Sequence, residues 1–279
     1  MKSAELFVPN FAELEELHRG DWPIGSNGGF RKIVFTMDRS SPRHQYAFRL
    51  AQLLAARTVG VEAIYFRGSA LESARSEWVR DLDLVVVASS DAMLTQREVK
   101  EIVGEFRREN PSELRVDVGV MGVSAVLASP FTSVKQLILA FRALRLSGRE
   151  VWPESPLVQP DVDLARACFI AHTEPTWQRL ATVAQDPAKH FQDPLVSWVQ
   201  KRALRAGGIL AMGRIGRFSR HPVRCAELVG LMFPDLAVLA ANVVHDYCAG
   251  DRHAHAWQAA VNLFDELRVR GNLLLFVHG

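Results

Sequence analysis

The first half of the chain alternates between two spacings of apolar residues. Three apolar or alternating runs predict strands: Val61–Phe66, Asp81–Val87 and Leu114–Val120. Helical spacing separates them over residues 46–59, which follow the cap-like pair Ser41-Pro42, and over residues 95–108. This alternation of helices and strands indicates an α/β or α+β core. Before it, residues 11–18 predict a short helix and residues 31–35 a short strand.

After Thr132 the strand patterns nearly vanish. Residues 133–146 have helical spacing and end at Ser147-Gly148, a plausible C-cap. The proline-rich stretch 151–160 is the best boundary candidate, and it divides the chain into domains at 1–150 and 151–279. Six helical segments follow that boundary: Asp163–His172, Thr176–Gln185, Pro194–Gly213, Pro222–Phe233, Leu236–Ala249 and Trp257–Arg268. We therefore expect an all-helical second domain.

Composition narrows the class of protein. The chain has 279 residues, which suits two domains, and 48% of them are hydrophobic, which is typical of a packed globular protein. A net charge of +2 argues against a surface built wholly for nucleic acid. The N-terminus lacks a signal-peptide pattern and no stretch reads as membrane-spanning. Three scattered cysteines, Cys168, Cys225 and Cys248, indicate buried thiols, and we expect a cytoplasmic protein.

The chemistry of the chain is concentrated in three short segments. Gly68-Ser69 ends the first strand and opens the next segment, so that free N–H groups of a helix start could hold an anion. Asp81 and Asp83 lie two apart on a strand, which places both carboxylates on one face. Asp117, on the third strand, could complete a cluster of three carboxylates. Hard oxygen ligands of this kind suit Mg²⁺ shared with a triphosphate.

These segments resemble the signature of the nucleotidyltransferase superfamily related to DNA polymerase β, and within it the small bacterial antibiotic nucleotidyltransferases. The resemblance covers about residues 42–120 as the core of the first domain. By this resemblance Gly68 and Ser69 match the phosphate-binding pair, Asp81 and Asp83 the metal aspartates, and Asp117 the third carboxylate. It implies an α+β fold in which a small mixed sheet with flanking helices precedes a helical accessory domain.

The resemblance also implies an activity. We expect a Mg²⁺-dependent transfer of a nucleoside monophosphate, AMP in the first instance, from a nucleoside triphosphate such as ATP to a hydroxyl acceptor. A small molecule such as an aminoglycoside-like alcohol is the favoured acceptor, because the chain is compact and only mildly basic. The alternatives are transfer to a protein or an RNA end, and a degenerate protein that only binds nucleotide. Arg80, where many relatives have a small hydroxyl residue, keeps the last alternative open.

Several other charged residues have candidate roles. Asp117 could be a metal ligand or the general base, and Glu150, Glu154 or Asp163 could supply that base instead. Glu150, Glu154, Asp161 and Asp163 could also line a pocket for a cationic acceptor. Lys201, Arg202 or Arg205 could reach a phosphate, although a solvated helix face is the simpler interpretation of this basic stretch. We interpret residues 251–255, with two histidines, as a polar loop and not as a metal site.

Overall fold

The computed structural model describes residues 3–9, 13, 16, 19–72, 81–89, 96–112, 115–152, 154–184, 193–251 and 253–276. The chain forms two compact units. The sheet unit comprises Met1–His18, Ile24–Ser129 and Lys135–Val158. The helical unit comprises Arg19–Pro23, Pro130–Val134 and Gln159–Gly279. The chain therefore passes into the helical unit for good after Val158, within the proline-rich stretch.

A small mixed sheet lies at the centre of the sheet unit. Its strands are β3 (Val61–Arg67), β4 (Asp81–Ala88), β5 (Arg115–Gly122) and β6 (Ala143–Gly148). Their spatial order is β5-β4-β3-β6, with β4 and β5 parallel and the other two pairs antiparallel. The predicted α+β fold with a small mixed sheet is thus confirmed. A separate parallel pair joins β1 (Leu6–Phe7) to β2 (Lys32–Ile33), inside the short strand expected near residue 33.

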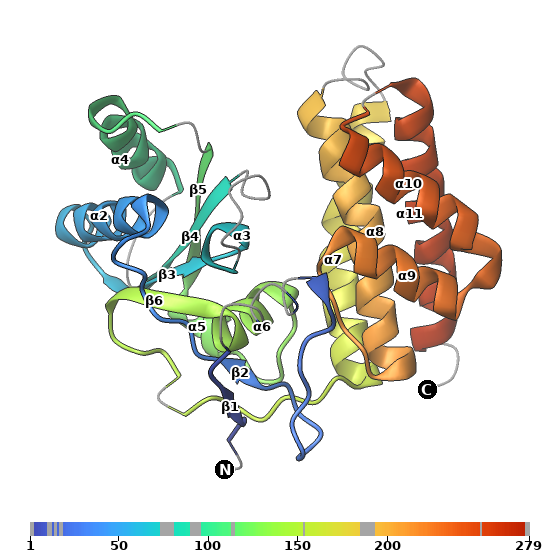
Figure 1. Ribbon diagram of the computed structural model, residues 1–279, viewed down its shortest axis with the longest axis horizontal. Coiled ribbons are helices and arrows are strands. Elements are labelled where there is room, and N and C mark those ends of the chain that lie inside the picture. Colours follow the sequence, from blue (N-terminus) through green and yellow to red (C-terminus); the bar gives the residue numbers. More distant parts are fainter. Residues whose placement is uncertain are drawn as a thin grey trace. The chain divides into compact units, whose positions relative to one another are not determined.

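Two helices cover one face of this sheet, as Figure 1 shows. They are α2 (Pro42–Arg57), whose first turn is capped by the Ser41 hydroxyl, and α4 (Gln96–Glu109). Alternate strand residues such as Phe66 and Leu84 point into the core between the sheet and these helices. Period two then sends the intervening residues, which include the aspartates, to the opposite face. The predicted helix over residues 11–18 falls largely outside the described residues.

The segment after residue 133 differs from the prediction of one helix to residue 146. A short helix, α5 (Val123–Leu127), follows β5, and α6 (Val134–Phe141) ends five residues early. Residues 143–148 instead form β6, the edge strand that pairs with β3. Leu144 and Leu146 pack against the core from this strand, and apolar residues two apart serve a half-buried strand as well as a short helical stretch. Residues 143–148 form a strand and not a helix because they can pair with β3 at the edge of the sheet.

The helical unit is built around one long helix. Helix α8 (Asp193–Ile215) packs against α7 (Val162–Ala184), α9 (Pro222–Met232), α10 (Ala237–Ala249) and α11 (Ala254–Phe276). A 3₁₀ turn, η3 (Pro234–Leu236), connects α9 to α10. The unit is all-helical as predicted, apart from the connecting segments. None of the described helices combines the length and the apolar character needed to cross a bilayer.

One boundary in this unit was predicted wrongly. The predicted helices over residues 163–172 and 176–185 are, as far as the structure describes them, a single helix, α7 (Val162–Ala184), that contains Pro175. Proline lacks an N–H and usually interrupts a helix. Here the hydroxyls of Thr173 and Thr176 donate to the carbonyls of Phe169 and His172 within the helix, at 2.7 Å each. Packing of α7 on α8 and α11 keeps the helix continuous across the proline.

The cysteines also depart in part from the expectation of buried thiols. All three are free, and Cys168 and Cys225 are buried. Cys248, however, is exposed near the end of α10.

Two glycines in helices give a matched test of packing. A Cβ at Gly271 in α11 would lie 2.4 Å from Phe169 Cζ, whereas a Cβ at Gly104 in α4 would meet nothing within 4 Å. We expect Gly104→Ala to stabilise the protein by up to about 1 kcal/mol through helix propensity. Gly271→Ala should destabilise it by about 1–3 kcal/mol through overpacking. Urea denaturation measures both, and equal shifts of the same sign would contradict the helix packing described for α11.

Candidate active site

The register of β4 and β5 brings the predicted aspartates together on one face of the sheet. Asp83 pairs with Asp117, and Asp81 pairs with Arg115, in the parallel ladder. Residues paired in this way project from the same face, and Asp81 and Asp83 share that face because they lie two apart. Asp81 and Asp83 are half-buried, and Asp117 is exposed. The three carboxylates therefore occupy one corner of the sheet, at the start of two neighbouring strands.

The Gly68-Ser69 turn lies directly against this corner. Gly68 has φ +82°, and a Cβ at this position would lie 2.7 Å from Asp83 Oδ2. Only glycine combines that backbone conformation with so close an approach. Ser69 begins α3 (Ser69–Glu72), in which the N–H groups of Leu71 and Glu72 donate to the Gly68 carbonyl at 3.0 and 3.1 Å. The N–H groups at the start of this single turn are thus placed beside a carboxylate that could hold a metal ion.

A buried ion pair anchors the far end of this turn. Arg142, between α6 and β6, donates from Nε to Glu72 Oε1 at 3.1 Å, and its Nη2 lies 3.1 Å from Glu72 Oε2. The two side chains are only 5% and 12% exposed. Two parallel hydrogen bonds from a guanidinium fix both the distance and the orientation of the carboxylate. Glu72 ends α3, so this pair holds the turn that begins at Gly68.

Arg67 also belongs to this corner, and the sequence analysis did not find it. It is the last residue of β3, and it pairs with Asp83 on one side and with Ala143 on the other. Arg67, Asp83 and Asp117 therefore form one row across three adjacent strands, on the same face. Its position directly before Gly68, at the end of a strand, was the available signal. Arg80, which had drawn attention as the neighbouring cation, lies outside the described residues.

The donor set at this corner fits Mg²⁺ in chemistry, because carboxylates supply the hard oxygens that this ion prefers. The arrangement is open. Among the described residues, three or more ligand atoms come within 4.8 Å of one another only at Asp246, Asp251 and His255. Asp117 thus shares a face with Asp81 and Asp83 without forming so tight a group with them.

The cluster of Asp246, Asp251 and His255 has a structural explanation. One oxygen of Asp251 accepts from the N–H of His253 at 2.9 Å, and the other lies 3.0 Å from His255 Nε2. The Asp251 N–H donates to the carbonyl of Asp246 at 2.8 Å, which closes the end of α10. Asp251 therefore joins the end of α10 to the start of α11. The polar loop predicted over residues 251–255 is thus shorter, because Ala254 and His255 already belong to α11.

Much of the basic stretch on α8 and the following loop is engaged within the helical unit. Arg202 donates to the Thr176 hydroxyl at 2.7 Å and to the carbonyl of His172. Burial, with the nearby Arg202 charge, lowers the pKa of His172 well below its usual range.

Two further arginines of this stretch, Arg217 and Arg224, form ion pairs with Asp21 at 2.6 and 2.8 Å. The Nε atom of Arg205, in contrast, is buried with no hydrogen-bond partner in the described part of the chain.

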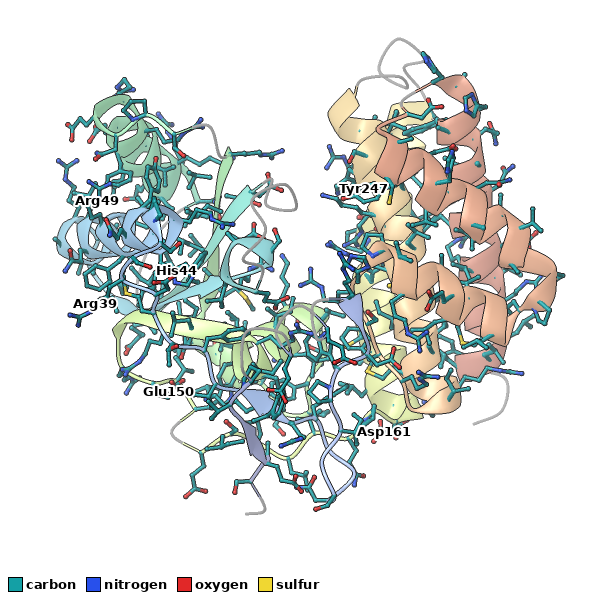
Figure 2. All side chains as sticks on the ribbon, viewed as in Figure 1. Arg39, His44, Arg49, Glu150, Asp161 and Tyr247 are labelled. Carbon is teal, nitrogen blue, oxygen red and sulfur yellow. The ribbon has the colours of Figure 1, made fainter. Side chains whose placement is uncertain are left out.

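The four acidic residues proposed for a cationic pocket have other surroundings. Glu150, labelled in Figure 2, follows β6 and accepts a hydrogen bond from the Tyr65 hydroxyl at 2.8 Å. Burial is the main cause of a raised pKa of Tyr65, and the hydrogen bond to Glu150 adds to it. Glu150 and Glu154 line a cavity of about 470 Å³, together with Lys32, Arg145 and Trp152. Its lining carries both signs of charge, so it is not the acidic pocket that was expected.

The other two residues of that set lie at the start of α7. Asp161 accepts from the N–H of Leu164 at 2.8 Å and caps the helix. Asp163 is 85% exposed and lies 3.4 Å from Arg166. Neither position requires a bound cation to explain its charge.

The strand order, the glycine turn and the aspartates on neighbouring strands agree with the fold that the resemblance to nucleotidyltransferases implies. The solved structure of the spectinomycin adenyltransferase AAD(9) from Enterococcus faecialis, with ATP and spectinomycin, is similar to this chain. The TM-score is 0.54 at 14% sequence identity, and the alignment covers 82% of this chain and 98% of that one. No protein-family model and no curated protein matches the sequence. The resemblance to small antibiotic nucleotidyltransferases is thus confirmed at the level of the fold.

Proposed function

We propose that the protein is a Mg²⁺-dependent nucleotidyltransferase that moves AMP from ATP to a hydroxyl of a small molecule. The observation that carries this proposal is the close approach of Gly68 to the Asp83 carboxylate, where a Cβ would lie 2.7 Å from Oδ2, with Asp83 in a row with Asp117. It places an anion-binding turn beside a carboxylate that could hold the metal ion of a triphosphate. The similar adenyltransferase was solved with ATP and an antibiotic, which supports the same donor and the same class of acceptor here.

The residues at this corner of the sheet have different roles in the proposed transfer. The backbone N–H groups at the start of α3 and the Ser69 hydroxyl hold oxygens of the β- and γ-phosphates. Asp81 and Asp83 would hold Mg²⁺, which neutralises phosphate charge and activates the acceptor hydroxyl. The acceptor oxygen then forms a bond to the α-phosphorus while the bond to the pyrophosphate oxygen breaks. Positioning and charge neutralisation supply most of the rate enhancement.

Asp117 is assigned the role of general base in this proposal. It is exposed and stands outside any tight group of ligand atoms with Asp81 and Asp83 among the described residues. Its carboxylate could accept the proton that the acceptor hydroxyl loses. The alternative, Asp117 as a metal ligand, predicts a different response to Mg²⁺.

Asp117→Asn separates these two roles. As a base variant it should lose transfer by about 10²–10⁴-fold and retain Mg²⁺-dependent ATP binding. Initial rates of pyrophosphate release and ATP titrations at several Mg²⁺ concentrations measure both quantities. A variant whose ATP binding requires much more Mg²⁺ than wild type would assign Asp117 to the metal instead.

Thermal unfolding with each of the four ribonucleoside triphosphates tests the donor without knowledge of the acceptor. ATP with Mg²⁺ at 100 times its Kd should stabilise the protein by about 2.7 kcal/mol, and ATP without Mg²⁺ by much less. For a chain of this size the melting temperature should rise on the order of 5 °C. A screen of aminoglycosides and aminocyclitols for pyrophosphate release follows. The absence of any shift with all four triphosphates would refute the proposed donor site.

A further inference from the structure

The row across the sheet contains an arginine, Arg67, with one buried donor atom that no described group accepts from. Arg67 stands between Ala143 and Asp83 in register, directly before the Gly68 turn. Its Nε atom is buried and has no hydrogen-bond partner among the described residues. The neighbouring Arg142 shows the contrast, because its Nε donates to Glu72 at 3.1 Å.

Leaving such a group unsatisfied costs free energy. A buried donor without an acceptor loses the hydrogen bonds that water would give it, and the penalty is larger for a charged group. A ligand that supplies the acceptor is one explanation for such a donor. Because the donor belongs to a guanidinium, an anionic oxygen is the acceptor that it binds most strongly.

We propose that Arg67 binds a phosphate oxygen of the donor triphosphate, in addition to the Gly68-Ser69 turn and the metal ion. This inference rests on the proposed function. Arg67 shares a face with Asp83 and Asp117, and the next residue, Gly68, lies so close to Asp83 that a Cβ there would be 2.7 Å from Oδ2. A phosphate bound at the turn, with Asp83 holding its metal ion, would lie within reach of the side chain of Arg67. A guanidinium matches phosphate oxygens in geometry and charge.

The position of Arg67 also predicts which part of the triphosphate its guanidinium contacts. The turn at the start of α3 holds the outer phosphates, whereas Arg67 lies on the strand beside the metal carboxylates. Arg67 would therefore neutralise charge close to the bond that breaks between the α-phosphate and pyrophosphate. Its contribution should be present for ATP and ADP, which carry the charge of that linkage, and smaller for AMP.

Arg67→Met tests this with a side chain of similar length and no charge. We expect the Kd of Mg²⁺-ATP to rise about 10- to 100-fold, the loss typical of a hydrogen bond to a charged group. The melting temperature without ligand should stay the same or rise, because a buried unsatisfied donor has been removed. Isothermal titration with ATP, ADP and AMP measures the affinities. Arg67→Lys, which keeps the charge but not the fork of donors, should lose less affinity.

Arg97→Met serves as the matched control. Arg97 lies on α4 with its side chain 88% exposed, so its loss removes the same charge from the same unit without touching the site. Unchanged ATP affinity is expected there. An Arg67→Met protein that binds ATP as wild type does would overturn the inference, as would a lowered melting temperature at unchanged affinity, which marks a structural role. A wild-type protein that binds no ATP would instead overturn the proposed function itself.

Discussion

Asp83→Asn should abolish nucleotidyl transfer and leave the fold intact. Asparagine has the same shape as aspartate, so it should fit beside Gly68 as Asp83 does, while the charge proposed to hold the metal ion is lost. Changes in the second shell of metal sites already reduce affinity or activity about 10- to 100-fold, and loss of a direct ligand should exceed this. Pyrophosphate release in the presence of an acceptor measures the effect, and thermal unfolding shows whether the fold is retained.

Glu101→Gln is the matched control for this substitution. Glu101 is on α4, with its side chain 60% exposed and paired only on the surface with Arg97. Its neutralisation should change both transfer and stability very little. Turnover by Asp83→Asn within tenfold of wild type would remove Asp83 from the metal site. A collapse of its melting temperature would leave the role of the charge to be tested with Asp81→Asn.

Arg142→Met should be the most destabilising of the substitutions considered. It leaves the Glu72 carboxylate buried without its guanidinium partner, and breaking a buried ion pair in this way costs about 3–5 kcal/mol. Because Glu72 ends α3, the turn that begins at Gly68 should loosen at the same time. Urea denaturation measures the first effect, and the Kd of Mg²⁺-ATP the second.

The double variant Arg142→Met with Glu72→Met separates charge from packing. Replacing a whole buried pair by apolar side chains is often neutral or stabilising, so much of the lost stability should return. Affinity for ATP should stay below wild type, since two methionines cannot fix the orientation of α3 as two parallel hydrogen bonds do. Full recovery of ATP affinity in the double variant would show that the ion pair does not position the turn.

Local pattern was a good guide wherever one face of an element is buried. The alternation in β4 placed Leu82 and Leu84 in the core and sent Asp81 and Asp83 to the other face. Prediction failed where neighbours in space decide. Residues 143–148 became a strand because the edge of β3 was open to pair with them. Helix α7 continued through Pro175 because it packs along α8 and α11.

The sequence by itself determined the helices and strands of the motif-bearing core, the glycine turn and the identity of the candidate carboxylates, because these depend on residue type and short-range spacing. Only the tertiary structure decided which of these residues become neighbours in space. The register of β3, β4 and β5 placed Arg67 in a row with Asp83 and Asp117, and the return of the chain through α6 brought Arg142 to Glu72. Those partners are far apart along the chain. Strand pairing and packing are non-local, and no short pattern encodes them.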